Sequence, residues 1–119
     1  MNKNHEIIKQ ILSLAEKARR EGLLALEEAK EDISDRILRK GLQLAIDGTD
    51  RDIIEKILDN IIDSKRHKSS YNTKDEVGWM LKKEGVLMIQ QGYNCRLILE
   101  MLNSYLDDDE IYDFEYDDD

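Results

Sequence analysis

The sequence contains no proline and a single cysteine among its 119 residues. Because Cys95 has no second cysteine to pair with, an intramolecular disulfide is excluded, and packing alone must stabilise the fold. Aromatic residues make up only 6% of the chain. The absence of proline, together with frequent Leu, Ile, Ala, Glu, Lys and Arg, favours helix throughout the chain.

Long uncharged apolar runs are also missing. A transmembrane helix needs about 20 nearly uncharged residues, and the uncharged stretch around Gly85 to Gly92 is much shorter. The N-terminus leads into an amphipathic stretch carrying Lys9 and Glu16, instead of the apolar core of a signal peptide. We therefore expect one small cytoplasmic domain with no membrane insertion.

An excess of positive charge is absent from the whole chain, whose formal net charge is −9. Residues 107–119 hold nine of the 27 acidic residues, so the other 18 (27 less 9) balance the 18 Lys and Arg residues of positions 1–106. A neutral body has no concentrated positive field, and nucleic acid is not expected as a partner. The acidic segment is predicted to be a disordered, solvated tail, although its aromatic residues leave docking on a basic groove open.

The spacing of apolar residues predicts an all-α fold of about five helices. These helices are expected at about residues 4–29, 32–46, 51–63, 74–90 and 95–106. Residues 64–73 contain no aliphatic side chain and are predicted to be the internal linker. The helical domain is therefore expected over residues 1–106, followed by the tail at 107–119.

Helix ends carry recognisable signals. Glycine in a left-handed conformation commonly follows the last residue of a helix, and a short polar side chain commonly caps the first turn. On this basis we expect Gly48 and Gly92 to end helices, and Asp50 and Asn94 to cap the helices that follow. Thr73 with Glu76, three residues later, predicts a capping box.

An internal repeat relates the two halves of the chain. A shift of 44 residues (85 less 41) aligns residues 41–63 with residues 85–107 without a gap. Each unit reads as helix, glycine stop, short turn, cap and helix, which predicts two related helical hairpins packed with a long N-terminal helix. The mid-helix glycines Gly22, Gly41 and Gly85 each cost about 1 kcal/mol relative to alanine. They are expected at close helix crossings, with tolerated surface positions as the alternative.

No group of residues predicts catalysis or metal binding. His5 in the N-terminus and His67 in the linker are expected to be solvated, and Cys95 is expected to be an ordinary small residue. Trp79 and Tyr93 are expected in the core. One cysteine and two histidines cannot form a closed zinc site, and glycine patterns that bind phosphates or dinucleotides are missing. We expect no enzyme activity, no cofactor and no metal.

Two segments resemble the cytoplasmic regions of the MotA family (MotA/TolQ/ExbB), whose members include the ion-channel subunit of the bacterial flagellar stator. The runs AEKARREGLLALEEA (15–29) and ILRKGLQLAIDGTDRDIIEKILDNII (37–62) are similar to its first cytoplasmic region. The run KKEGVLMIQQGYNCRLILEMLNSYL (82–106) is similar to the tail after its last membrane helix. The family usually has proline at the position of Cys95, and residues 107–119 lie outside its pattern.

The resemblance implies a protein-binding site. In the MotA family an arginine and a glutamate flanking the Gly-Leu-Leu run contact the rotor switch-complex protein, and they match Arg19 and Glu27. On one continuous helix, residues eight apart project from the same face about 12 Å from each other. The alternative is an ordinary solvated face, since neighbouring residues are equally charged: Arg20, Glu21, Glu28 and Lys30.

We therefore expect a MotA-like, non-enzymatic module that binds a protein. Its partner is expected to be the rotor switch-complex protein or a membrane stator ring, and an artificial fusion of two loops fits the same pattern. Without the membrane helices of the family, ion conduction is not expected. The alternative is a regulatory or structural helical homo-oligomer, unrelated to motility, that self-associates through apolar helix faces.

Overall fold

The computed structural model describes residues 2–68 and 72–113. Within these residues the chain forms α-helices and short 3-10 helices and no strand, which confirms the all-α fold. The elements are α1 (Lys3–Glu21), η1 (Leu23–Ala25), α2 (Leu26–Lys30), α3 (Arg36–Ile46), α4 (Arg51–Arg66), α5 (Thr73–Gln91), α6 (Cys95–Asn103) and η2 (Asp108–Glu110).

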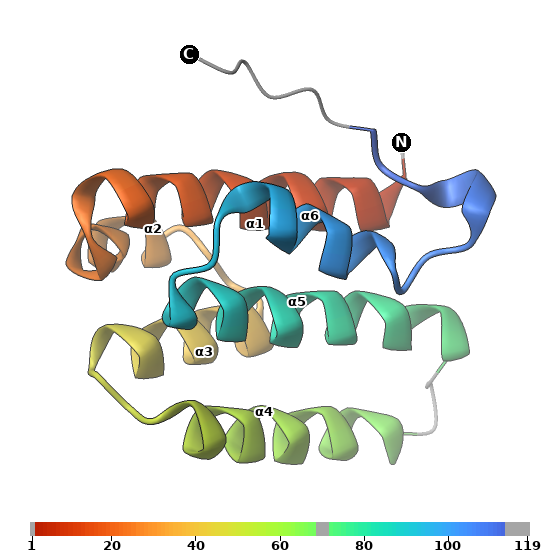
Figure 1. The fold of residues 1–119 in the computed structure, drawn as a ribbon. Coiled ribbons are helices and arrows are strands. Elements are labelled where there is room, and N and C mark those ends of the chain that lie inside the picture. Colours follow the sequence, from red (N-terminus) through yellow and green to blue (C-terminus); the bar gives the residue numbers. More distant parts are fainter. Residues whose placement is uncertain (1, 69–71, 114–119) are drawn as a thin grey trace.

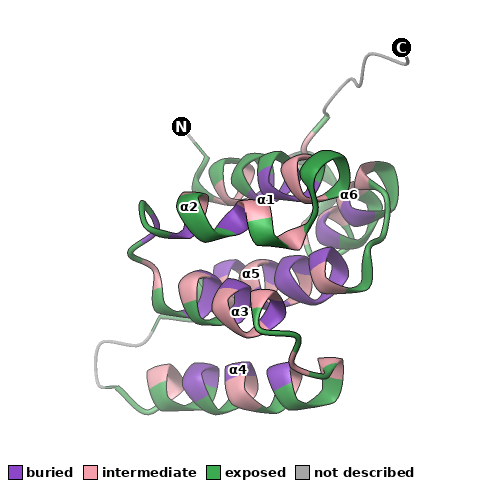
Figure 2. Ribbon diagram, turned by 90° about the vertical axis from the view of Figure 1, so that its left-hand side faces the viewer, coloured by how far each residue is buried: buried purple, intermediate pink, exposed green. Residues whose placement is uncertain are grey.

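Helix α5 lies at the centre of the molecule. It contacts α1 and α6 on one side and α3 and α4 on the other, as Figure 1 shows. Its sequence explains this position, because buried residues occur all around the helix instead of along one stripe. These residues are Gly78, Leu81, Lys83, Gly85, Val86, Leu87, Met88 and Ile89. The outer helices bury residues along one side only. In Figure 2 the buried residues of α4 face α3 and α5.

Two glycines allow α5 to approach its neighbours closely. A Cβ atom added to Gly41 on α3 would lie 2.8 Å from a Val86 methyl carbon on α5. A Cβ atom added to Gly85 on α5 would lie 2.6 Å from Cδ1 of Ile11 on α1. Both glycines therefore lie at helix crossings that a larger residue would push apart. They also match each other in the 44-residue alignment (85 less 41), although the repeat itself stays a prediction.

The long N-terminal helix predicted over residues 4–29 is wrong. Helix α1 ends at Glu21, and Gly22 adopts φ 91° and ψ 162°, which lies outside the helical region. Open space surrounds the Cβ position of Gly22, so this glycine is a helix stop and not a crossing residue. The break allows α2 to turn back and pack against α3, which buries Leu26 completely.

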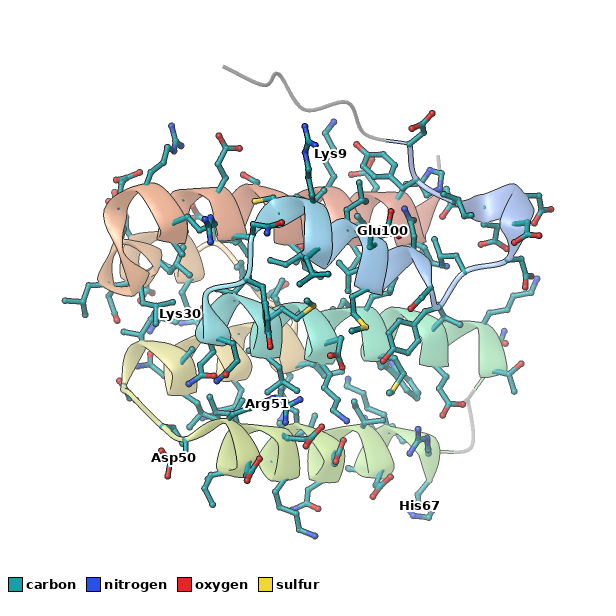
Figure 3. All side chains as sticks on the ribbon, viewed as in Figure 1. Lys9, Lys30, Asp50, Arg51, His67 and Glu100 are labelled. Carbon is teal, nitrogen blue, oxygen red and sulfur yellow. The ribbon has the colours of Figure 1, made fainter. Side chains whose placement is uncertain are left out.

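Three of the four other predicted helix stops and caps are present in the structure. Gly48 and Gly92 adopt φ angles of 80° and 77°, in the left-handed region. The side chain of Asn94 accepts a hydrogen bond from the backbone N–H of Leu97 at 2.9 Å. Asp50 precedes α4 with an extended backbone, but its carboxylate makes no capping hydrogen bond. Figure 3 shows that side chain pointing away from the helix, so the prediction of a carboxylate cap at Asp50 is wrong.

The predicted linker is shorter than residues 64–73, because α4 continues to Arg66. Arg66 contacts Asp63 at 2.7 Å and donates through Nε to Glu76 of α5 at 2.7 Å, which holds the last turn of α4. Asn72 caps α5, through a 2.9 Å hydrogen bond from a backbone N–H of the first turn. Thr73 is already helical, so the prediction of Thr73 as the capping residue of a capping box is wrong.

The first part of the acidic segment packs against the helices. The side chain of Asn103 accepts from the backbone N–H of Tyr112 and donates to its carbonyl oxygen, both at 2.9 Å. The rings of His5 and Tyr112 lie 5.1 Å apart, and Nε2 of His5 bonds to the carbonyl oxygen of Glu110. The predictions of a solvated His5 and of disorder throughout 107–113 are therefore wrong. Residues 114–119 of the predicted tail lie outside the described residues.

Candidate partner-binding surface

Arg19 lies in the exposed last turn of α1 and reaches another part of the fold. Its Nη1 atom donates a hydrogen bond to the carbonyl oxygen of Gly92, 2.7 Å away. Gly92 ends α5, where carbonyl oxygens lack partners within the helix. A guanidinium is a favourable donor at such a site. Arg19 therefore ties the end of α1 to the turn between α5 and α6.

Glu27 lies in the first turn of α2 and also has an intramolecular partner. Its carboxylate oxygen Oε1 accepts a hydrogen bond from Nζ of Lys30 at 3.1 Å. Lys30 is only 7% exposed, and its ammonium group also bonds to the side-chain oxygen of Gln43 on α3. Figure 3 shows Lys30 where α2 meets α3. Because a buried ammonium group must be paired, Glu27 helps to hold α2 on α3.

The predicted geometry of this pair is therefore wrong, although both residues are exposed. Arg19 belongs to α1 and Glu27 to α2, on the two sides of the break at Gly22. Their relative position depends on that turn instead of on two turns of one helix. Their role in binding a partner stays a prediction.

The break also exposes a residue that the sequence analysis missed. Leu24 is 76% exposed, while Leu23 is half-buried and Leu26 is fully buried. In a short 3-10 helix, neighbouring side chains point in different directions, so two adjacent leucines cannot both face the core. The Gly-Leu-Leu run after a charged helix end was the available signal. It places an apolar side chain between Arg19 and Glu27 in the chain.

A shallow hollow of about 340 Å³ lies beside Leu23, the residue that precedes Leu24 in the chain. It is lined by Ala18, Arg19, Leu23, Ile89, Gln90, Gln91 and Gly92. Its aliphatic lining can receive an apolar side chain, and the guanidinium of Arg19 lies among its polar groups. We name the hollow, together with Leu24 and Glu27, the α1–α2 surface. It combines a protruding apolar group, an apolar recess and charges of both signs, which suits a protein partner better than a small molecule.

A partly buried ion-pair network lies elsewhere, between α4 and α5. The ammonium group of Lys83 lies 2.7 Å from a carboxylate oxygen of Asp59 and 3.5 Å from one of Glu55. Burial alone lowers the pKa of Lys83, but the hydrogen bond and charge of Asp59, assisted by Glu55, outweigh burial and raise it. This network joins α4 to α5.

The reactive side chains Cys95 and His67 lie on different elements, at the start of α6 and at the end of α4. Cys95 is half-buried with Sγ 4.0 Å from the carbonyl oxygen of Leu12, and His67 is exposed at the end of α4. Trp79 packs partly against the core, whereas Tyr93 is exposed, so the prediction of a core role for Tyr93 is wrong. The carboxylates of Asp107, Asp109 and Glu110 lie within 4.8 Å of one another, but exposed acidic groups are common without a metal.

In the described part of the chain, no helix is both long and apolar enough to span a membrane. No family model matches the chain. Motility protein A of Treponema phagedenis is 46% identical over 55 residues, which is 46% of this chain and 21% of that protein. Motility protein A of Bacillus subtilis is 36% identical over 84 residues, 69% of this chain and 31% of that protein.

A third relative, the uncharacterized protein YtxD of Bacillus subtilis, is 36% identical over 75 residues, 61% of this chain and 28% of that protein. The chain thus spans about a fifth to a third of the length of the curated relatives it matches. Its likeness to these proteins is partial, and the rest of each relative has no counterpart in the aligned residues.

Proposed function

We propose that this chain, which is similar to motility protein A over part of its length, is a non-enzymatic protein-binding module of a bacterial flagellar motor. The partial identities confirm the resemblance to MotA that the sequence indicates. The proposed location is the cytoplasm, and the proposed partner is the rotor switch-complex protein. The observation that supports the proposal is the exposed Leu24, which lies in the sequence between the two residues that the resemblance assigns to rotor contact and follows Leu23, a residue that lines a partly apolar hollow.

In the proposed α1–α2 surface, apolar groups and charged groups have different roles in binding. Leu24 and the hollow supply the area that a partner can bury, and buried apolar contacts carry most of the affinity at protein interfaces. Arg19 and Glu27 are held by Gly92 and Lys30, so they present their charges in a fixed arrangement. Charges at the rim mainly steer the encounter and orient the partner. A membrane stator ring is the second candidate partner for the same surface.

Titration calorimetry against the C-terminal domain of the rotor switch-complex protein, at low salt, tests this proposal. The main variant is Leu24→Ser, because it removes the apolar contact without touching a buried side chain. The matched control is Ile53→Ser, which changes an apolar residue of α4 that is 52% exposed. We expect Leu24→Ser to weaken binding at least about tenfold and Ile53→Ser to leave it within about twofold.

The possible outcomes test the proposed partner and the proposed surface separately. Absence of binding by the unaltered chain at high micromolar concentration contradicts the rotor protein as partner, and the same titration with a membrane stator ring then tests the second candidate. Binding that Leu24→Ser leaves unchanged contradicts the α1–α2 surface. A salt series from about 0.05 to 0.5 M adds a further check, because steering by exposed charges weakens as salt rises while apolar contact does not.

A further inference from the structure

Helix α6 carries an apolar stripe on its outer side as well as on its buried side. Ile98 and Leu102 are fully buried against the core. Leu97, Met101 and Tyr105 follow one another at intervals of four residues and are 43%, 38% and 36% exposed. Residues four apart lie on the same face of a helix, so Leu97 and Met101 form a row on α6, and Tyr105 continues the spacing in the turn after the last helical residue, Asn103. We name these three residues the outer stripe.

Helix α4, which the 44-residue alignment pairs with α6, buries two of the three matched positions more fully. The 44-residue alignment pairs Ile61 of α4 with Tyr105 (105 less 61), and Ile57 with Met101 (101 less 57). Ile61 is only 5% exposed and Ile57 is half-buried. The third matched position differs, because Ile53, which pairs with Leu97 (97 less 53), is 52% exposed. The outer stripe is therefore more open than α4 at Met101 and Tyr105.

The charges beside the outer stripe are arranged to complement a copy of themselves. Arg96 and Glu100 are one turn apart on the same flank of the stripe, and Figure 3 shows Glu100 on α6. In an antiparallel pair of helices related by a two-fold axis, the same flanks face each other. Arg96 of each copy then faces Glu100 of the other copy, and Leu97 of each packs against Met101 of the other.

The charges at the two ends of α6 also favour an antiparallel pair. Its basic end holds Arg96, while the chain beyond its other end carries Asp107, Asp108 and Asp109. An antiparallel copy brings the basic end of each helix toward the acidic end of the other, whereas a parallel copy would place like charges together. Tyr105 is already positioned, because its hydroxyl group donates to a carboxylate oxygen of Glu84 on α5 at 3.5 Å. Ordering it on binding therefore costs little entropy.

We propose that the outer stripe of α6 is a contact surface for a second copy of this chain, which packs against it as an antiparallel helix pair. The contact uses one short helix from each copy, so it is smaller than a standard protein interface, and the dimer is weak and depends on concentration. This self-association is separate from the α1–α2 surface and does not rest on the proposed partner.

Sedimentation equilibrium of the full chain from about 10 µM to about 1 mM tests the proposal. We expect the unaltered chain to shift from monomer to dimer across this range, and Met101→Glu to remain monomeric. The control Ile53→Glu places the same charge on an exposed residue of α4 and should leave the dimer unchanged. Thermal unfolding of each variant shows that the fold is kept.

Two charge reversals give a sharper test. Arg96→Glu and Glu100→Arg each place like charges across the proposed contact, and each should raise the dissociation constant of the dimer at least about tenfold. An equimolar mixture of the two variants restores both intermolecular pairs and should dimerise again. Contacts within one chain cannot produce this recovery, because each molecule in the mixture still carries its reversal.

Three results would overturn the proposal. The first is a chain that remains monomeric at about 1 mM. The second is a dimer that Met101→Glu leaves intact, and the third is a mixture of the two reversed variants that stays as monomeric as each variant alone.

Discussion

The guanidinium group of Arg19 and the carbonyl oxygen of Gly92 lie 2.7 Å apart, although 73 positions separate the two residues in the chain. This hydrogen bond joins the end of α1 to the turn between α5 and α6. It also fixes the direction of a charged side chain at the edge of the α1–α2 surface. A residue that the resemblance assigns to an external partner thus has an internal one as well.

Arg19→Ala is expected to destabilise the fold by about 0.5–1 kcal/mol, because the bond to Gly92 is charge-assisted but exposed to solvent. Arg20→Ala, on the same exposed turn, is the matched control and should change the free energy of unfolding by less than about 0.5 kcal/mol. Urea denaturation measures both. An equal effect of the two substitutions would show that the hydrogen bond contributes nothing.

Glu27→Lys is expected to cost about 1–2 kcal/mol of stability, because it removes a partner of the buried Lys30 and adds a like charge. Lys30→Met replaces the buried ammonium group by an apolar chain of similar length and should change stability by less than about 1 kcal/mol. In the Lys30→Met background, Glu27→Lys should therefore cost less. Chemical denaturation of the four proteins measures this coupling.

The same pair of substitutions separates folding from binding. If Glu27 contacts the partner, Glu27→Lys weakens binding in the Lys30→Met background too. If it acts only through Lys30, the effect on binding disappears there together with the effect on stability.

Gly85→Ala is expected to destabilise the fold by about 1–3 kcal/mol, because the added methyl group overlaps Ile11 at the crossing of α5 and α1. Ile11→Val removes the nearest carbon atom, Cδ1, and should reduce the cost of Gly85→Ala when the two changes are combined. Asn60→Ala on the exposed side of α4 serves as the control for a helical alanine. Additive effects of the two core changes would contradict a direct overlap.

Stability at alkaline pH is expected to depend on Lys83. Its pKa in the folded chain is raised above the usual 10.5, so above that pH the folded state binds more protons than the unfolded state. The stabilisation is therefore complete below about pH 10 and is lost as pH rises through the folded pKa. Lys83→Met should show a weaker loss of stability between about pH 10 and pH 12.

Tyr105 requires a separate control in this pH range. Burial first, and then the charge of Glu84, raise the pKa of its phenol group, so its ionisation also lowers stability at high pH. The comparison is therefore made in a Tyr105→Phe background, by denaturation at each pH. A pH profile that Lys83→Met leaves unchanged there would contradict the role of Lys83.

Asn103→Ala is expected to release the segment around Tyr112, because it removes both hydrogen bonds to that backbone. Protection of the Tyr112 amide proton against exchange should fall by about tenfold, while amides in the centre of α5 keep their protection. Hydrogen exchange followed residue by residue measures both sites. Unchanged protection at Tyr112 would show that packing beside His5 is sufficient to hold the segment.

Much of the helical order could be predicted from the sequence, because its signals are local. Gly48, Gly92 and Asn94 act on residues within one turn of themselves, and apolar spacing defines the helices between them. Local signals led to wrong predictions where a residue contacts another helix. Glu76 has the spacing of a capping box with Thr73, but Thr73 is itself helical, and Glu76 pairs with Arg66 of α4.

The candidate surface was harder to predict for the same reason. The resemblance identified Arg19 and Glu27. The helical spacing of apolar residues continued across Gly22, however, so the turn between Arg19 and Glu27 was not predicted. The positive φ of that glycine becomes favourable only when α2 can bury Leu26 and Lys30 against α3. The exposure of Leu24 follows from this turn and from no property of leucine itself.

The sequence by itself determined an all-helical chain, the positions of most helix ends and a neutral body with an acidic end. Only the tertiary structure decided that α1 stops at Gly22, that Lys30 is buried beside Glu27 and that Tyr112 docks beside His5. The division has a physical reason. Helix formation and capping depend on neighbours within one turn, whereas these three features depend on groups that only the packed fold brings together.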